Sequence, residues 1–179
     1  MLGVGHVMGK ILMITATGGT NHELAKKFAD MSVELGHDAD VVDLSEIDFP
    51  MFTMARSKEL DVVPGMAELK QKMGESESWM IIAPEYNGSM PPTLNNAVAW
   101  LSTEWNDFRA LFNRRKVGLA THSGGGGAHV IMAMRQMFSF LGCIVIGRSC
   151  IANKNKEANP ETIEDLSLIH ISEPTRQLC

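Results

Sequence analysis

The chain has 179 residues, of which 45% are hydrophobic and 21% are charged, a balance that excludes a disordered segment, a collagen-like fibre and a disulfide-stabilised miniprotein. A single domain is expected at this length. The net charge is −5, from 21 acidic residues against 16 scattered basic ones, so nucleic acid and anionic membranes are disfavoured as partners.

The apolar runs and the cysteines predict a protein of the reducing cytoplasm. No apolar run approaches the roughly 20 residues of a membrane-spanning helix, and the first residues lack a signal-peptide pattern. The three cysteines (Cys143, Cys150 and Cys179) form neither a CxxC pair nor a metal-ligand spacing. Met8 opens MGKILMIT and offers an alternative start, so the domain is expected over residues 8–165.

The first half of the chain predicts two strands, each followed by a helix. Residues 10–15 (KILMIT) form a short apolar strand that ends in a glycine-rich turn. Apolar residues then recur at helical spacing over 24–35, and Gly36 ends this helix. Residues 39–44 are the second strand, and the apolar spacing over 66–73 marks the second helix.

The second half repeats this alternation. Strands are predicted at 79–83, 116–121 and 143–147, with helices at 94–101 and 130–141 between them. Five strands that alternate with helices predict an α/β fold in which helices cover both faces of a parallel sheet. Ligands of such folds bind at the carboxyl ends of the strands.

The last predicted helix begins at Asn159 and Pro160, an N-cap residue followed by a proline suited to the first turn. Its continuation, residues 166–176 (LSLIHISEPTR), resembles the translation of a transposon adaptor used in preparing sequencing libraries. Residues 166–179 are therefore predicted to be a non-native tail that truncates this helix, and a genuine C-terminal helix or strand is the alternative. Truncation would leave part of the sheet uncovered and favour aggregation.

The loop after the first strand, TATGGTNHE, combines two glycines with three threonines at the start of a helix. Its backbone N–H groups and the helix N-terminus suit a phosphate group. It lacks the lysine of a P-loop and the GxGxxG spacing of dinucleotide folds, which favours a monophosphate. A capping box of Thr20 and Glu23 is the alternative interpretation.

The loop after the third strand reads PEYNGSMPPTLNNAVAWLS over residues 84–102. Three prolines stiffen it, and Tyr86, the only tyrosine of the chain, suits a flat ligand. A structural turn before a helix is the alternative. The pattern PEYNxSxPxxLxNAxxW resembles the signature of the NADPH-dependent FMN reductase family, flavodoxin-like enzymes that include quinone, azo-dye and chromate reductases.

The loop after the fourth strand, THSGGGG, supports this resemblance. Its four glycines allow backbone N–H groups to approach the edge of a flat ring, whereas a flexible hinge is the alternative. Residues 48–52 (DFPMF) are similar to the family's apolar substrate-side loop. The similarity spans residues 9–165 and implies a flavodoxin-like three-layer sandwich with strand order 2-1-3-4-5.

The resemblance implies an FMN site made by these three loops. The phosphate would lie at Thr15, Thr17, Gly18, Gly19, Thr20 and Asn21. The ring and ribityl chain would lie against Pro84, Glu85, Tyr86 and Asn87. The pyrimidine edge would lie on Ser123, Gly124, Gly125 and Gly126, where N–H groups would stabilise negative charge at N1 and O2 of the reduced flavin.

The implied activity is hydride transfer from NADPH or NADH through FMN to a quinone, flavin, azo compound or similar acceptor, with no side chain named as an obligatory acid or base. A non-enzymatic flavodoxin-type electron carrier is the alternative, because the threonine-rich first loop departs from the family's GSxRxxS pattern. The six histidines show no ligand spacing, so no metal is expected. The family also implies a homodimer or homotetramer, with the helix containing Trp100 as a candidate interface.

Overall fold

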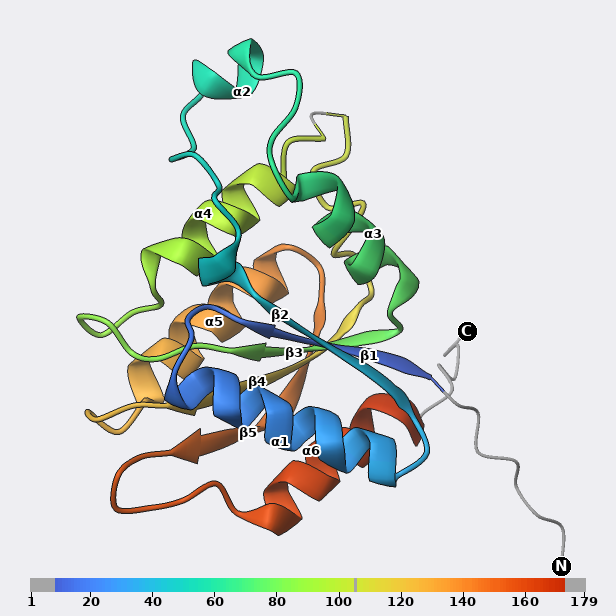
Figure 1. Cartoon of the computed structure of the whole chain (residues 1–179), viewed down its shortest axis with the longest axis vertical. Helices are drawn as coiled ribbons and strands as arrows, with labels where there is room; N and C mark the ends of the chain where they lie inside the picture. Colours follow the sequence, from blue (N-terminus) through green and yellow to red (C-terminus); the bar gives the residue numbers. More distant parts are fainter. Residues whose placement is uncertain (1–8, 105, 173–179) are drawn as a thin grey trace, which may run out of the picture.

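The computed structural model describes residues 9–104 and 106–172, which fold around one five-stranded sheet (Figure 1). All strand pairs are parallel, and the order is β2-β1-β3-β4-β5, as predicted. The strands are β1 (Lys10–Thr15), β2 (Asp38–Asp43), β3 (Ser78–Ile82), β4 (Lys116–His122) and β5 (Ile144–Ala152). The order reverses at β1, because β1 pairs with β2 on one side and with β3 on the other.

Helices cover both faces of the sheet, which confirms the three-layer prediction (Figure 1). The helices are α1 (Thr20–Glu34), α2 (Arg56–Glu59), α3 (Met66–Glu75), α4 (Pro92–Leu101), α5 (Ala128–Phe140) and α6 (Pro160–Ser172), with a 3-10 turn η1 at Leu44–Glu46. α1 and α6 contact each other on one face, whereas α3, α4 and α5 cover the other. None of the helices in the described part of the chain has the length and apolarity to cross a membrane.

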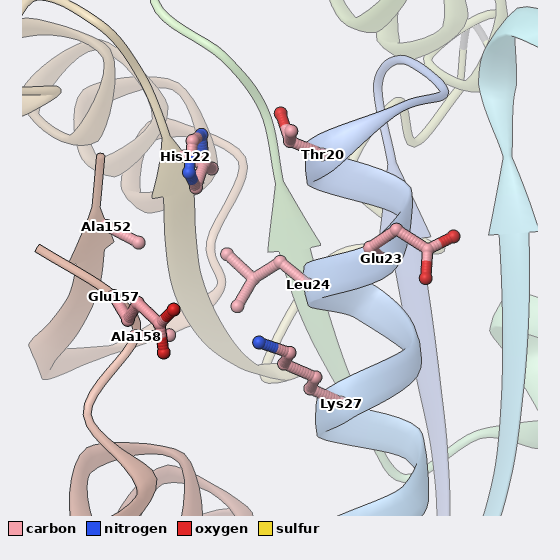
Figure 2. Close-up of a pocket in the computed structure, with 8 residues that line it drawn as sticks. All are labelled: Thr20, Glu23, Leu24, Lys27, His122, Ala152, Glu157 and Ala158. Atoms are coloured by element: carbon pink, nitrogen blue, oxygen red, sulfur yellow. The ribbon is translucent and has the colours of Figure 1, made fainter. Parts of the chain in front are cut away.

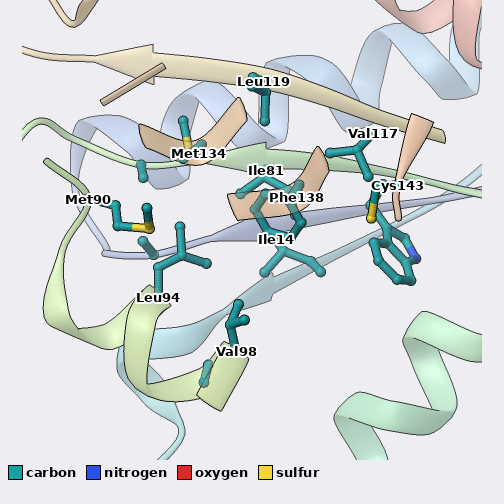
Figure 3. Close-up of a cluster of buried hydrophobic side chains, with 14 of the residues drawn as sticks. Ile14, Ile81, Met90, Leu94, Val98, Val117, Leu119, Met134, Phe138 and Cys143 are labelled. Atoms are coloured by element: carbon teal, nitrogen blue, oxygen red, sulfur yellow. The ribbon is translucent and has the colours of Figure 1, made fainter. Parts of the chain in front are cut away.

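Two hydrophobic cores result from the alternation of side chains along each strand. In β1, Leu12 and Ile14 point into the larger core, under α3, α4 and α5, while Ile11 and Met13 point into the smaller one, under α1 and α6. Figure 3 shows the larger core, in which Ile14, from β1, lies among side chains of other strands and helices. Burial on both faces explains why β1 and β3 are continuous apolar runs.

The fifth strand is longer than predicted, since β5 extends to Ala152 and not only to residue 147. Its pairing with β4 resumes after an irregularity opposite Val117–Leu119. There the Arg135 guanidinium donates to the carbonyls of Ile146, at 2.8 Å, and Gly147, at 3.1 Å. The apolar pattern stops at Gly147, whereas backbone pairing does not depend on apolar side chains. The pattern therefore underestimated the length of this edge strand.

The last helix begins at Pro160, as predicted, and continues past residue 165 to Ser172. Ile163 and Leu166 are buried on the α1 side of the sheet, so this face is covered in the described structure. The non-native origin of residues 166–179 stays a prediction, and Cys179 lies outside the described residues.

Candidate functional site

Three loops meet at the carboxyl edge of the sheet, after β1, β3 and β4. Backbone hydrogen bonds hold their first residues side by side: Ala16 N donates to Ile82 O at 2.8 Å, and Ala83 N to Ala120 O at 3.2 Å. The edge is the one at which parallel α/β folds bind ligands, next to the reversal of strand order. The fourteen residues predicted from the sequence are therefore brought to one edge.

The predicted residues differ in how much they face solvent. Those that are exposed are Gly18, Gly19, Thr20, Tyr86, Asn87, Gly124, Gly125 and Gly126. Those that are half-buried are Thr17, Pro84 and Glu85. Those that are buried are Thr15, Asn21 and Ser123, and all three use their side chains inside the protein.

The first loop leaves the N-terminus of α1 open. Thr15 is buried and donates its hydroxyl to Thr17 O at 2.7 Å, which shapes the loop from within. Gly19 is the N-cap residue at φ 65°, and no side chain caps the helix, so the alternative Thr20–Glu23 capping box is not formed. An uncapped helix N-terminus beside a threonine hydroxyl provides donors and positive potential for an anion.

Asn21 joins the first loop to the end of β4. It is only 3% exposed, its Nδ2 donates to His122 O at 3.0 Å, and its Oδ1 accepts from His122 N at 2.9 Å. Both polar atoms of the amide are thus used in the same backbone contact. Asn21 positions the loop and is not free to bind a phosphate through its side chain.

An acidic residue and a histidine flank the first loop on the β2 side, and sequence analysis did not assign either to the site. His22 Nδ1 lies 3.4 Å from Asp43 Oδ2, an ion pair when the imidazole is protonated, and the Asp43 side chain is 7% exposed. A Cβ on Gly18 would lie 3.4 Å from the same carboxylate. The signal in the sequence was an aspartate at the end of the second strand, where it faces the first loop of the fold.

The second loop presents Tyr86 on a tight turn. Tyr86 and Ser89 exchange two backbone hydrogen bonds of 2.9 Å each, and Asn87 and Gly88 have φ values of 52° and 71°. The Asn-Gly pair suits these left-handed conformations. Tyr86 is 48% exposed at this edge of the sheet.

The start of α4 is attached to the first loop, and its body to the 48–52 segment. Thr93 Oγ1 donates to Ala16 O at 2.6 Å. Asn96 accepts from Phe52 N at 2.7 Å and donates to Pro50 O at 3.0 Å, and Trp100 Nε1 donates to the same carbonyl at 2.7 Å. The Asn and Trp of the NAxxW pattern therefore hold the apolar segment that is similar to the family's substrate-side loop.

Replacing Asn96 by alanine is expected to destabilise the protein by about 1 kcal/mol, because Phe52 N loses its acceptor. Hydrogen exchange should show faster exchange of the Phe52 amide. Asn95→Ala is the matched control, since Asn95 is exposed on the same helix. Equal exchange of Phe52 in both variants would contradict the proposed attachment.

The third loop is open at its glycines. A Cβ on Gly124 or Gly126 would meet no described heavy atom within 4 Å, so the backbone there lies beside open space. Ser123, in contrast, is buried, and its hydroxyl lies 2.7 Å from Thr121 Oγ1. The loop thus combines a fixed start with an accessible backbone, as a site for the edge of a flat ring requires.

A cavity of about 170 Å³ opens beside the first loop, between α1 and the ends of β4 and β5 (Figure 2). It is lined by Thr20, Glu23, Leu24, Lys27, His122, Ala152, Glu157 and Ala158. Figure 2 shows Thr20 at the start of α1, one turn above Leu24, and His122 at the end of β4. Thr20 is the one residue that this cavity shares with the predicted phosphate site.

Neither a thiolate nor a metal is supported by the described residues. Burial raises the pKa of the Cys143 thiol to about 12 and also raises the pKa of Cys150. A raised pKa favours the protonated thiol, so neither cysteine is a candidate nucleophile. No cluster of three or more His, Cys, Asp or Glu side chains suited to a metal ion occurs among the residues that the structure describes.

Comparisons with known proteins find similarity to one protein family and to two reductases. The family model described as NADPH-dependent FMN reductase matches residues 10–158. A quinone reductase of Escherichia coli K12 is 27% identical over 153 residues, which cover 82% of this chain and 77% of that protein. A 2-hydroxy-1,4-benzoquinone reductase of Burkholderia is 29% identical over 85 residues, 48% of this chain and 44% of that protein.

Solved structures share the fold at low sequence identity. The flavoenzyme NAD(P)H:acceptor oxidoreductase of Paracoccus denitrificans superposes with a TM-score of 0.72 at 15% identity, covering 92% of this chain and 96% of the other. An azoreductase of Bacillus anthracis gives 0.61 at 14% identity, covering 92% and 95%. An archaeal flavodoxin gives 0.60 at 9% identity, covering 90% and 94%.

Proposed function

Because the chain belongs to the NADPH-dependent FMN reductase family, we propose that it binds FMN with the three loops at the carboxyl edge of the sheet and transfers hydride from NAD(P)H to a small electron acceptor. Family membership makes the protein an oxidoreductase that uses FMN as cofactor and NADPH as electron donor. The position of FMN in the fold and the acceptor that it reduces are proposed here. The observation that carries it is the convergence of an uncapped helix N-terminus, an exposed tyrosine turn and an open glycine loop.

The phosphate of FMN fits the first loop. The threonine hydroxyl of Thr20 and the uncapped N–H groups of the first turn of α1 are donors suited to an anion, and Gly18 and Gly19 leave the approach free of side chains. Nearby, Thr15 and Asn21 keep the loop in shape through their internal hydrogen bonds. Neutral donors and the helix dipole thus replace the arginine of the family's usual first loop.

The flavin ring fits the other two loops. Tyr86 offers an exposed aromatic surface on a turn whose backbone is fixed by two hydrogen bonds. The glycine loop offers N–H groups that no Cβ obstructs, suited to the pyrimidine edge. When bound, FMN supplies the hydride chemistry, so the residues of the chain need only bind, orient and shield it.

The acceptor is proposed to be a quinone. The two curated relatives named above are quinone reductases, and the Asn96–Trp100 attachment holds an apolar segment, residues 49–52, near the same edge of the sheet. We also propose a cytoplasmic homo-oligomer, as the family resemblance implies. Membership of an NADPH-dependent family argues against the non-enzymatic carrier that the threonine-rich first loop suggested.

The experiment is an absorption spectrum of the purified protein after incubation with FMN and desalting, followed by anaerobic addition of NADPH and then a quinone. Retained flavin absorption that is lost with NADPH and returns with the quinone is the expected result. Retained absorption that neither NADPH nor NADH removes would contradict hydride transfer from NAD(P)H to the bound FMN. A folded protein that retains no flavin would contradict FMN binding.

Replacing Thr20 by alanine is expected to weaken FMN binding by roughly tenfold, because a hydrogen bond to a charged phosphate is lost. Riboflavin, which has no phosphate, should bind both proteins equally. Titration of each flavin by fluorescence quenching measures the difference, with Thr162→Ala on α6 as the control. Equal losses for FMN and riboflavin would place the phosphate elsewhere.

A further inference from the structure

The carboxylate of Glu85 lies on the N-terminus of α5. Its Oε2 accepts hydrogen bonds from His129 N at 3.0 Å and from Val130 N at 3.1 Å. The N-cap residue of α5 is Gly127, which has no side chain with which to cap the helix. A residue from the loop after β3 therefore supplies the cap that the local sequence lacks.

The backbone of Glu85 makes a second attachment to the same loop. Glu85 N donates to Ser123 Oγ at 2.7 Å, and that hydroxyl is buried against Thr121 Oγ1. Glu85 thus holds the first residue of the 123–127 segment through its N–H group, and it holds the first turn of α5, which follows this segment, through its carboxylate. The glycines between have no side chains to fix their conformation, and Gly126 and Gly127 are at φ 96° and 72°.

The position of the carboxylate also changes the local charge. The N-terminus of a helix carries about half a positive elementary charge, and a full negative charge lies on it here. The other carboxylate oxygen, Oε1, would lie 3.5 Å from a Cβ on Gly125. The negative charge of Glu85 therefore lies next to the glycine backbone. Without this carboxylate, the N-terminus of α5 would give that backbone a positive potential.

We propose that Glu85 is a positioning residue that holds the glycine loop in shape and at the same time withdraws the positive potential of α5 from the flavin. The charge part rests on the proposed function. Reduced FMN carries more negative charge than oxidised FMN at the edge assigned to this loop, so a nearby carboxylate disfavours the reduced form. Bound FMN is thereby kept strongly reducing, which favours release of hydride to the acceptor.

The variants separate the two attachments. Glu85→Gln removes the charge but keeps an amide oxygen that can accept from the α5 N–H groups. Glu85→Ala removes both charge and cap, whereas Ser123→Ala removes the acceptor of Glu85 N without changing any charge. Glu164→Gln, at an exposed position of α6, is the charge control.

Two measurements test the proposal on the whole chain: the midpoint potential of bound FMN, and hydrogen exchange of the 123–130 amides without FMN. In Glu85→Gln, reduced FMN should gain about tenfold in affinity relative to oxidised FMN, which raises the two-electron potential by about 30 mV. Glu164→Gln should leave the potential unchanged, and Ser123→Ala should leave the exchange of His129 and Val130 unchanged, because it keeps the carboxylate on α5. In Glu85→Ala, His129 and Val130 should exchange faster than in the unmodified chain.

If the midpoint potential of bound FMN is unchanged or lower in Glu85→Gln, the proposed effect of the Glu85 charge on the flavin is overturned. If the amides of His129 and Val130 exchange at an unchanged rate in Glu85→Ala, the proposed role of Glu85 in holding the loop is overturned. If the unmodified chain binds no FMN, the proposed function fails, and the proposed effect of the Glu85 charge on the flavin fails with it. The exchange measurement still decides whether Glu85 holds the loop, because it uses the protein without flavin.

Discussion

Replacing Gly127 by alanine is expected to destabilise the protein by about 2–5 kcal/mol and to abolish FMN binding. Gly127 is buried at φ 72°, a left-handed conformation that costs an alanine about 1–2 kcal/mol. An added Cβ would lie 2.5 Å from Thr121 Cγ2, and relieving such an overlap costs about 1–3 kcal/mol more. The shift needed would move the glycine loop and the start of α5 together.

Chemical denaturation and FMN titration measure the two effects. Gly124→Ala is the control within the same loop, because Gly124 is exposed and its Cβ would meet no described heavy atom within 4 Å. Gly124→Ala should therefore keep the stability of the unmodified chain. If the two alanine variants unfolded at the same denaturant concentration, the close approach at Gly127 would be refuted.

Replacing Asn21 by alanine is expected to cost about 2–6 kcal/mol of stability and to weaken FMN and riboflavin binding together. His122 N and His122 O, both part-buried, would lose their partner, and each unpaired group costs about 1–3 kcal/mol. Both flavins are affected because Asn21 connects the phosphate loop to the end of β4, from which the glycine loop starts. Thr20→Ala, by contrast, should affect FMN alone.

Asn21→Asp tests the two hydrogen bonds of Asn21 separately, because it keeps the acceptor and removes the donor. The aspartate can still accept from His122 N, but it places a negative charge against His122 O in place of a donor, so it should be at least as destabilising as alanine. Asn155→Ala, at an exposed position, is the control. Thermal unfolding of the four proteins provides the comparison, and a stability loss under about 0.5 kcal/mol in Asn21→Ala would refute a role of Asn21 in joining the loops.

The architecture was predictable because it depends on periodic burial. Strands with apolar side chains on both faces, such as KILMIT, occur where helices cover both sides of a parallel sheet. The four-residue helix α2 was not predicted, and it has no buried residue from which a pattern could arise. The same reason applies to β5, whose second half is held by backbone pairing with β4.

The loops of the candidate site could be predicted from the sequence, because the carboxyl ends of parallel strands must share one edge and because PEYN and the glycine run are local patterns. The contacts of each side chain there depend on tertiary packing. Asn21, Glu85 and Ser123 were predicted to contact FMN, yet their polar groups bond to backbone or side chains 38 to 101 residues away. Such partners are set by how strands and helices pack in space, a non-local property that spacing along the chain does not encode.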